Sequence, residues 1–136
     1  RAPLQVFARI DVAAGGNGIP SGDSARLQGL ACLIAQGSGP AFRDLLPSVV
    51  HAEIAAGEFF GPRSGVVARV AARLAAMHTG FDPRGFAVPE VYFHRHSKAY
   101  QQCRANYRDR PGEVVLFHLA AWAVGGKEAD AIARAA

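Results

Sequence analysis

The sequence predicts an all-α fold, built as a single compact domain of several helices. Apolar residues recur at helical spacing along nearly the whole chain, whereas no alternating pattern of useful length indicates a strand. Clusters of glycine and proline separate the helical stretches. With 136 residues, half of them apolar, the chain is long enough to bury a core without disulfide or metal staples. We therefore expect one domain over residues 1–136.

Two helices are predicted before residue 40. The first covers 3–14, because a proline suits its first turn and the glycine-rich segment 15–18 stops it. The second follows Asp23 or Ser24, either of which can cap a helix N-terminus, and ends at Gly37.

The third predicted helix covers about 41–57. Pro47 lies inside it and either kinks the helix or divides it in two. At 100° per residue, Glu53 falls on the apolar side of the second half, while His51 points away from that side. A carboxylate that faces inward is usually paired, so we expect Glu53 to have a basic partner.

The fourth predicted helix covers about 65–78 and stops at Gly80. Its many alanines let neighbouring helices approach closely. Arg69 and Arg73 lie one turn apart, and we expect one of them to pair with Glu53 because they are the nearest cations in the sequence. The apolar stripe that they border consists of Val66, Val70, Leu74 and Met77.

The last third of the chain is predicted as a loop over 81–88 followed by helices. One helical stretch covers about 89–108 and is either continuous or broken near 94–97. The final helix begins at Pro111, and the glycine pair 125–126 is expected to divide off a short last turn.

Charge favours anionic partners in general. The net charge of +4 comes mostly from arginines scattered along the chain, which favours ion pairs and solvated faces over a nucleic-acid surface. If the chain has a nucleic-acid surface, residues 95–110 are the best candidate for it.

No apolar run reaches the roughly 18 residues of a membrane span. We expect a soluble cytoplasmic protein without a membrane partner. Since the chain begins with Arg1, its N-terminus is expected to be trimmed or incomplete.

No metal site is predicted. Cys32 and Cys103 have no partner at ligand spacing and are expected to be buried free thiols. His94 and His96 lie two apart without a nearby carboxylate or thiol, which favours exposed or capping histidines over a metal pair. His118 is expected to pack in the core.

The most informative segment is 58–69, where a turn-rich loop leads directly into the fourth helix. Backbone N–H groups at a helix start attract anions. One interpretation is therefore a phosphate or nucleotide site. The other is an ordinary interhelical turn, with Ser64 as the N-cap and Arg69 in an ion pair. The candidate anion-binding residues are Gly61, Arg63, Ser64, Gly65 and Arg69.

These positions keep the spacing of the motif H-P-F-x-x-G-N-G-R-x-x-R, with Phe60, Gly65 and Arg69 matching it. On this basis residues 41–122 resemble the Fic/Doc (Fido) domain family, in particular its divergent actinobacterial members. The resemblance implies a helical fold and transfer of nucleotide groups, usually AMP, to protein hydroxyls. It also implies ATP or another nucleotide, with Mg²⁺, as cofactor.

Five positions depart from the motif. Glu58 stands where the family has its catalytic histidine, Ser64 where it has a metal-binding asparagine, and Val66 where an arginine neutralises phosphate charge. A carboxylate repels an incoming triphosphate and is a weaker base than imidazole near pH 7. The other departures are Phe59 for proline and Arg63 for the first glycine.

The sequence therefore predicts a degenerate Fic-like domain, a pseudoenzyme that acts as a binding or regulatory module with a residual phosphate or nucleotide site. One alternative is a divergent AMPylator-like nucleotidyltransferase, in which Glu58, Arg63 and Ser64 carry modified chemistry. A second is an oligomerising helical domain without a ligand. A protein partner and a homo-oligomer both stay open.

Overall fold

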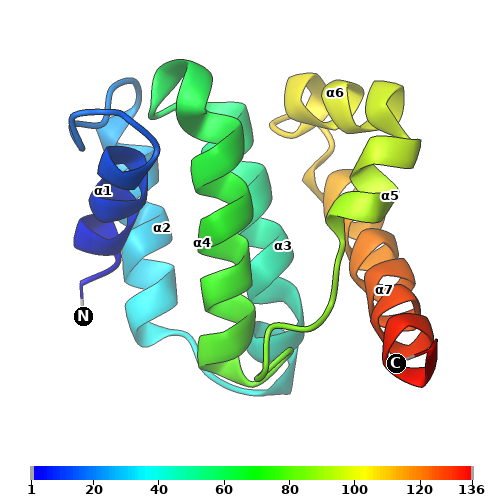
Figure 1. Cartoon of the computed structure of the whole chain (residues 1–136). Helices are drawn as coiled ribbons and strands as arrows, with labels where there is room; N and C mark the ends of the chain where they lie inside the picture. Colours follow the sequence, from blue (N-terminus) through cyan, green and yellow to red (C-terminus); the bar gives the residue numbers. More distant parts are fainter. Residues whose placement is uncertain (1, 136) are drawn as a thin grey trace.

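The computed structural model describes residues 2–135, which contain seven α-helices, one short 3₁₀ helix (η1) and no strand (Figure 1). The all-α prediction is confirmed. None of these helices combines the length and apolar character needed to cross a membrane. The elements are α1 (Pro3–Ala13), α2 (Ser24–Gln36), α3 (Pro40–Gly57), η1 (Gly61–Arg63), α4 (Ser64–Thr79), α5 (Glu90–Arg95), α6 (Ser97–Asn106) and α7 (Pro111–Ala135).

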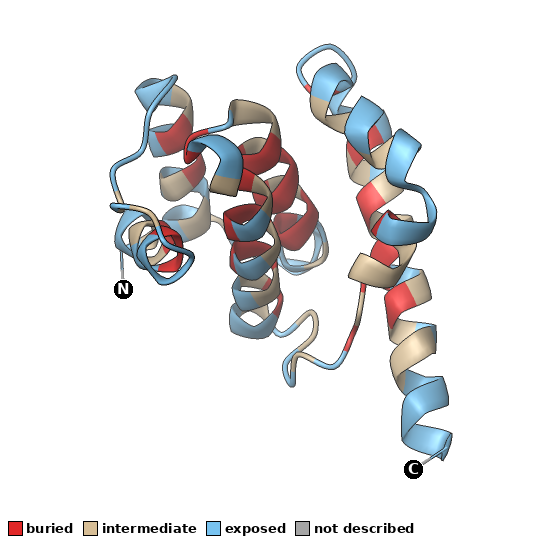
Figure 2. Cartoon of the chain, turned by 45° about the horizontal axis from the view of Figure 1, so that its top comes forward, coloured by how far each residue is buried: buried red, intermediate tan, exposed pale blue. Residues whose placement is uncertain are grey.

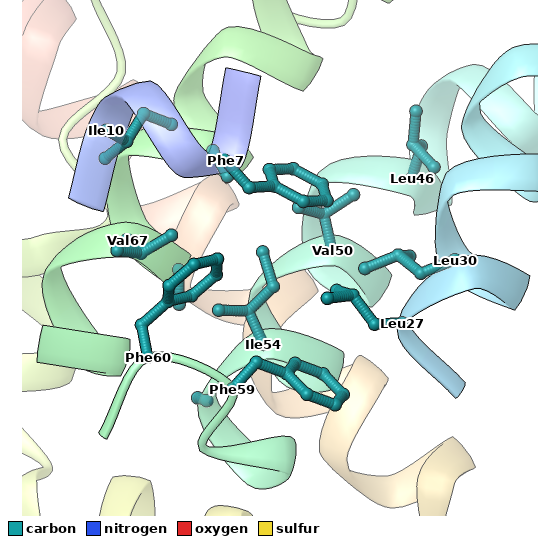
Figure 3. Close-up of a cluster of buried hydrophobic side chains, with 13 residues drawn as sticks. Phe7, Ile10, Leu27, Leu30, Leu46, Val50, Ile54, Phe59, Phe60 and Val67 are labelled. Atoms are coloured by element: carbon teal, nitrogen blue, oxygen red, sulfur yellow. The ribbon is translucent and has the colours of Figure 1, made fainter. Parts of the chain in front are cut away.

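Helices α1 to α4 enclose the larger core. In Figure 1, α4 lies in front of α3, with α1 and α2 on one side of this pair and α5 to α7 on the other. Large side chains from all four N-terminal helices meet between them (Figure 3). We call this cluster the N-terminal core, and its largest members are Phe7, Ile10, Leu27, Leu30, Leu46, Val50, Ile54, Phe59, Phe60 and Val67.

Helix α3 is buried on two sides. Val50 and Ile54 face the N-terminal core, whereas Ala52 packs with Tyr107 of the C-terminal part.

Helix α3 runs without interruption through Pro47. Because proline has no N–H to donate, the Arg43 carbonyl lacks its usual helical partner and accepts a hydrogen bond from the Thr79 hydroxyl at 3.5 Å.

Helix α4 buries its alanines. The small residues 68, 71, 72 and 76 are almost completely buried, as Figure 2 shows for the inner side of this helix. The larger residues Val66, Val70, Leu74 and Met77 remain 39–42% exposed, and we call them the α4 stripe. Small side chains allow α3 and α4 to approach closely, and this packing leaves the bulkier face outside.

Helix α7 crosses the loop that precedes α5. The helix is continuous through Gly125, so the predicted division at 125–126 was wrong. Gly125 instead marks a close approach: a Cβ at this position would lie 2.5 Å from the Val88 carbonyl carbon. The Val88 N–H donates to the Gly125 carbonyl at 3.2 Å.

The predicted break between α5 and α6 occurs at His96.

Candidate functional site

The loop between α3 and α4 is held mainly by its own bonds. Glu58 ends α3 in the left-handed region, with φ of 50°. Phe59 and Phe60 are buried below the loop. The Gly61 N–H donates to the Glu58 carbonyl at 3.1 Å, and the Arg63 N–H donates to the Phe60 carbonyl at 3.2 Å. These two backbone donors are therefore not available to an anion above the loop.

Two of the candidate anion-binding side chains also point inward. The Ser64 hydroxyl is fully buried and accepts a hydrogen bond from the Phe60 N–H at 3.0 Å. Arg63 Nε donates to Asp11 Oδ1 at 2.6 Å, and the Asp11 carboxylate, which is 0% exposed, also accepts from the Gly18 N–H at 3.0 Å. The hydrogen bond from Arg63 is the main reason why the pKa of Asp11 is lowered.

Arg69 is placed differently. It is half-buried, and no carboxylate in residues 2–135 lies within ion-pair distance of it. Its guanidinium covers Gly65, where an added Cβ would lie 3.3 Å from Nη1. The same guanidinium lies close to the Tyr100 hydroxyl. Burial raises the pKa of Tyr100, and the nearby positive charges of Arg69 and Arg104 partly offset this rise. The Arg69 guanidinium therefore lies between Gly65, at the start of α4, and Tyr100 of α6.

Next to Arg69 lies a group of rings that we call the histidine cluster: the buried His51, Phe93 and His118 and the half-buried Tyr100. His51 Nε2 is 2.7 Å from the Tyr100 hydroxyl, and its ring centroid is 4.5 Å from that of His118. Both imidazoles are 2% exposed. Burial, reinforced by His118 and then by Arg69 and Arg104, lowers the pKa of His51 well below its ordinary value, and burial lowers that of His118 to about 4. Both rings are therefore neutral at pH 7.

Arg104 and Glu58 lie at the solvent edge. Arg104 Nη2 is 3.5 Å from Glu58 Oε1, and 69% of the Glu58 side chain is exposed. We call the group of Gly65, Arg69, Tyr100 and Arg104 the Arg69 site. Two cations beside a tyrosine hydroxyl and two neutral histidines form a set that can hold an oxyanion. The Glu58 carboxylate on the rim opposes such binding.

The predicted pairing of Glu53 with Arg69 or Arg73 was wrong. Glu53 receives two hydrogen bonds from Arg26 of α2, both at 2.9 Å, and a third from the Tyr107 hydroxyl at 2.8 Å. Arg73 pairs with Glu90 instead.

The partners of Arg73 lie at the start of α5. Its guanidinium donates to Glu90 Oε1 at 2.7 Å and to the Ala87 carbonyl at 2.9 Å. Glu53 does face inward as predicted, but helices distant in sequence supply its partners.

The remaining titratable candidates do not form a site. His94 and His96 are exposed, and no group of three or more metal-ligating side chains occurs among residues 2–135. Cys32 and Cys103 are free thiols, but Cys32 is exposed and Cys103 is only partly buried, so the predicted burial was wrong for Cys32 and holds only in part for Cys103. His118 is buried as predicted.

Of the five predicted anion-binding residues, the structure brings Gly65 and Arg69 into one site and turns Arg63 and Ser64 into the fold. Gly61 is exposed in the loop. Sequence reasoning missed the contributions of Tyr100 and Arg104. The available signal was the row of small residues 48, 52 and 55 on α3 next to His51, since such a row indicates a second packed face of the helix.

Comparisons with protein-family models, with curated proteins and with solved structures give no significant match.

Proposed function

We propose that this protein is a Fic-like helical domain that binds a phosphate-bearing ligand at the Arg69 site without transferring it. The observation that carries the proposal is the half-buried guanidinium of Arg69, which has no carboxylate partner among the described residues. The other half-buried arginines of α4 and its loop, Arg63 and Arg73, are each paired with a carboxylate.

The physical basis is charge compensation. Removing a guanidinium from water costs free energy unless an anion or several acceptors replace the water. An oxyanion over Gly65 would accept hydrogen bonds from Arg69 and would also be attracted by Arg104. The Tyr100 hydroxyl lies at the same place, beside Arg69 and 2.7 Å from His51 Nε2, so it links the Arg69 guanidinium to the histidine cluster.

Several features argue against transfer chemistry. Glu58, which the resemblance aligns with the family's catalytic histidine, is mostly exposed and contacts Arg104. Ser64, aligned with the metal-binding asparagine, is buried and accepts a hydrogen bond from the backbone. The residue aligned with the proton acceptor is therefore paired with a cation at the rim of the Arg69 site, and the residue aligned with the metal ligand is buried.

Calorimetric titration with inorganic phosphate and with ATP, each with and without Mg²⁺, tests the proposal. We expect binding to the unmodified protein and a loss of about 10- to 100-fold in affinity for Arg69→Ala, the effect of removing one charged hydrogen-bond donor. Glu58→Gln should strengthen binding because it removes a repulsive charge. Arg108→Ala is the matched control, since Arg108 is exposed and outside the site.

Equal affinity of the Arg69→Ala variant and the unmodified protein would contradict the proposed site. Incubation with labelled ATP tests the absence of transfer: label attached to protein, and lost on Glu58→Ala, would favour the divergent transferase instead. A stable dimer that binds neither phosphate nor ATP would favour the oligomerising domain.

A further inference from the structure

The α4 stripe is an exposed apolar surface next to a groove. It runs from Val66 to Met77, and at 1.5 Å per residue this interval spans about 16 Å, or three helical turns. Contiguous exposed apolar surface on a protein commonly marks an interaction site. The row belongs to a helix whose other face is already buried in the fold, so it is available for a second contact.

The wall opposite the stripe is α1. A hollow of about 450 Å³ lies between the two helices, lined by Val6 and Ile10 of α1 and by Val66, Val70 and Leu74 of α4. A second hollow of about 310 Å³ continues from it, because Val6 and Leu74 line both. We call the two together the α1–α4 groove. Its length and apolar lining match one face of a short helix.

The charge around this groove has one sign. Arg9 is exposed and lines the first hollow, and among residues 2–135 it is the one charged residue that lines either hollow. The only carboxylate on α1, Asp11, is buried against Arg63, and α4 contains no acidic residue. The two helices therefore place one cation, Arg9, at the groove and no exposed anion beside it.

We propose that the α1–α4 groove binds an acidic amphipathic helix of another protein, with apolar residues at i, i+4 and i+7 seated on the α4 stripe and a carboxylate facing Arg9. A second copy of this chain fits less well. In a two-fold symmetric pair the same face meets itself, so each Arg9 would meet a surface to which α1 and α4 contribute no exposed carboxylate. This surface is distinct from the Arg69 site and does not depend on phosphate binding.

Selection from a displayed library of amphipathic helical peptides tests the groove. The intact chain is the target, and peptides that also bind Leu74→Glu are removed. We expect the survivors to carry glutamate or aspartate beside their apolar stripe. In fluorescence anisotropy, Leu74→Glu should weaken a selected peptide at least about 10-fold and Arg9→Glu about 5-fold.

Leu116→Glu is the matched control, because Leu116 is 67% exposed on α7 and should leave peptide affinity unchanged. If Leu74→Glu does not fold, Val70→Glu replaces it, and thermal unfolding establishes that the variant used is folded.

Three results would overturn the proposal. The first is enrichment of basic peptides, or no enrichment over the counter-selected variant. The second is a dimer in sedimentation that Leu74→Glu dissociates, since this would assign the groove to a second copy. The third is binding to vesicles containing phosphatidylserine that Leu74→Glu abolishes, since this would assign the surface to a membrane.

Discussion

The two buried faces of α3 differ in chemistry. The face toward α1, α2 and α4 packs aliphatic and aromatic side chains into the N-terminal core. The face toward α5 to α7 packs the histidine cluster and the Glu53–Tyr107 hydrogen bond. Three buried polar atoms without a hydrogen-bond partner among the described residues, Ser48 Oγ, His118 Nδ1 and Trp122 Nε1, belong to α3 and α7.

This difference indicates how stability is distributed. Apolar burial in the N-terminal core does not depend on pH, whereas each unpartnered buried polar atom costs about 1–3 kcal/mol. We therefore expect α5 to α7 to separate from α3 at a lower free energy than is needed to unfold the N-terminal core. Amide hydrogen exchange measures this directly, and equal protection in α3 and α7 would contradict it.

Removing a large side chain from the N-terminal core should have the largest effect. Phe59 is completely buried, so Phe59→Ala should lower the free energy of unfolding by about 3–5 kcal/mol. Urea denaturation at two pH values measures it, and the loss should be the same at both. Phe86→Ala is the control, since Phe86 is 65% exposed and its loss should be below about 1 kcal/mol.

Acid should weaken the packing of α3 against α5 to α7. Because the pKa of His118 is about 4 in the fold against about 6.5 when unfolded, the unfolded chain binds more protons between these values. Stability is therefore fully present above pH 6.5 and falls as the pH drops toward 4, by about 3 kcal/mol for this residue. The lowered pKa of His51 acts in the same direction.

Urea denaturation across this pH range separates the two faces. His118→Gln should flatten the pH dependence, and His94→Gln, which changes an exposed histidine, should leave it intact. An unchanged slope in His118→Gln would mean that this ring does not stay neutral in the fold.

The Glu53–Tyr107 hydrogen bond should contribute less. Tyr107→Phe removes the donor 2.8 Å from the Glu53 carboxylate and should cost about 1.5–3 kcal/mol. Glu53→Gln should also lower the melting temperature. A double-mutant cycle of the two measures their coupling, and purely additive losses would contradict the contact.

The smallest effects should come from the two adjacent glycines of α7. Gly125→Ala places a methyl group against the Val88–Pro89 backbone and should cost about 1–3 kcal/mol. Gly126→Ala meets no atom within 4 Å and should stabilise the helix by about 0.5–1 kcal/mol. If both substitutions stabilise the protein, α7 does not approach this loop closely.

Local signals predicted the helices well, because caps and breaks depend on neighbouring residues. The ends at Gly37 and Gly80 and the start at Pro111 agree with the structure within one residue. The buried face of α4 was less accessible to this reasoning: hydrophobicity favours the α4 stripe, but the alanine face fits the close approach of α3.

The candidate site was predictable only in part. Gly65 and Arg69 were identifiable because they lie within one motif-length segment. Tyr100 and Arg104 come from α6, and their position depends on how the C-terminal helices pack on α3. The same reason explains the partner of Glu53, since Arg26 lies 27 residues upstream on α2.

The double burial of α3 also limits how this fold can be divided. A fragment ending at residue 88 would expose His51 and Ala52 to water, and a fragment beginning at residue 89 would lack the helix on which its own rings pack. Neither piece carries a complete interior. The two ends of the molecule are therefore not independent modules, because each completes its interior against the other.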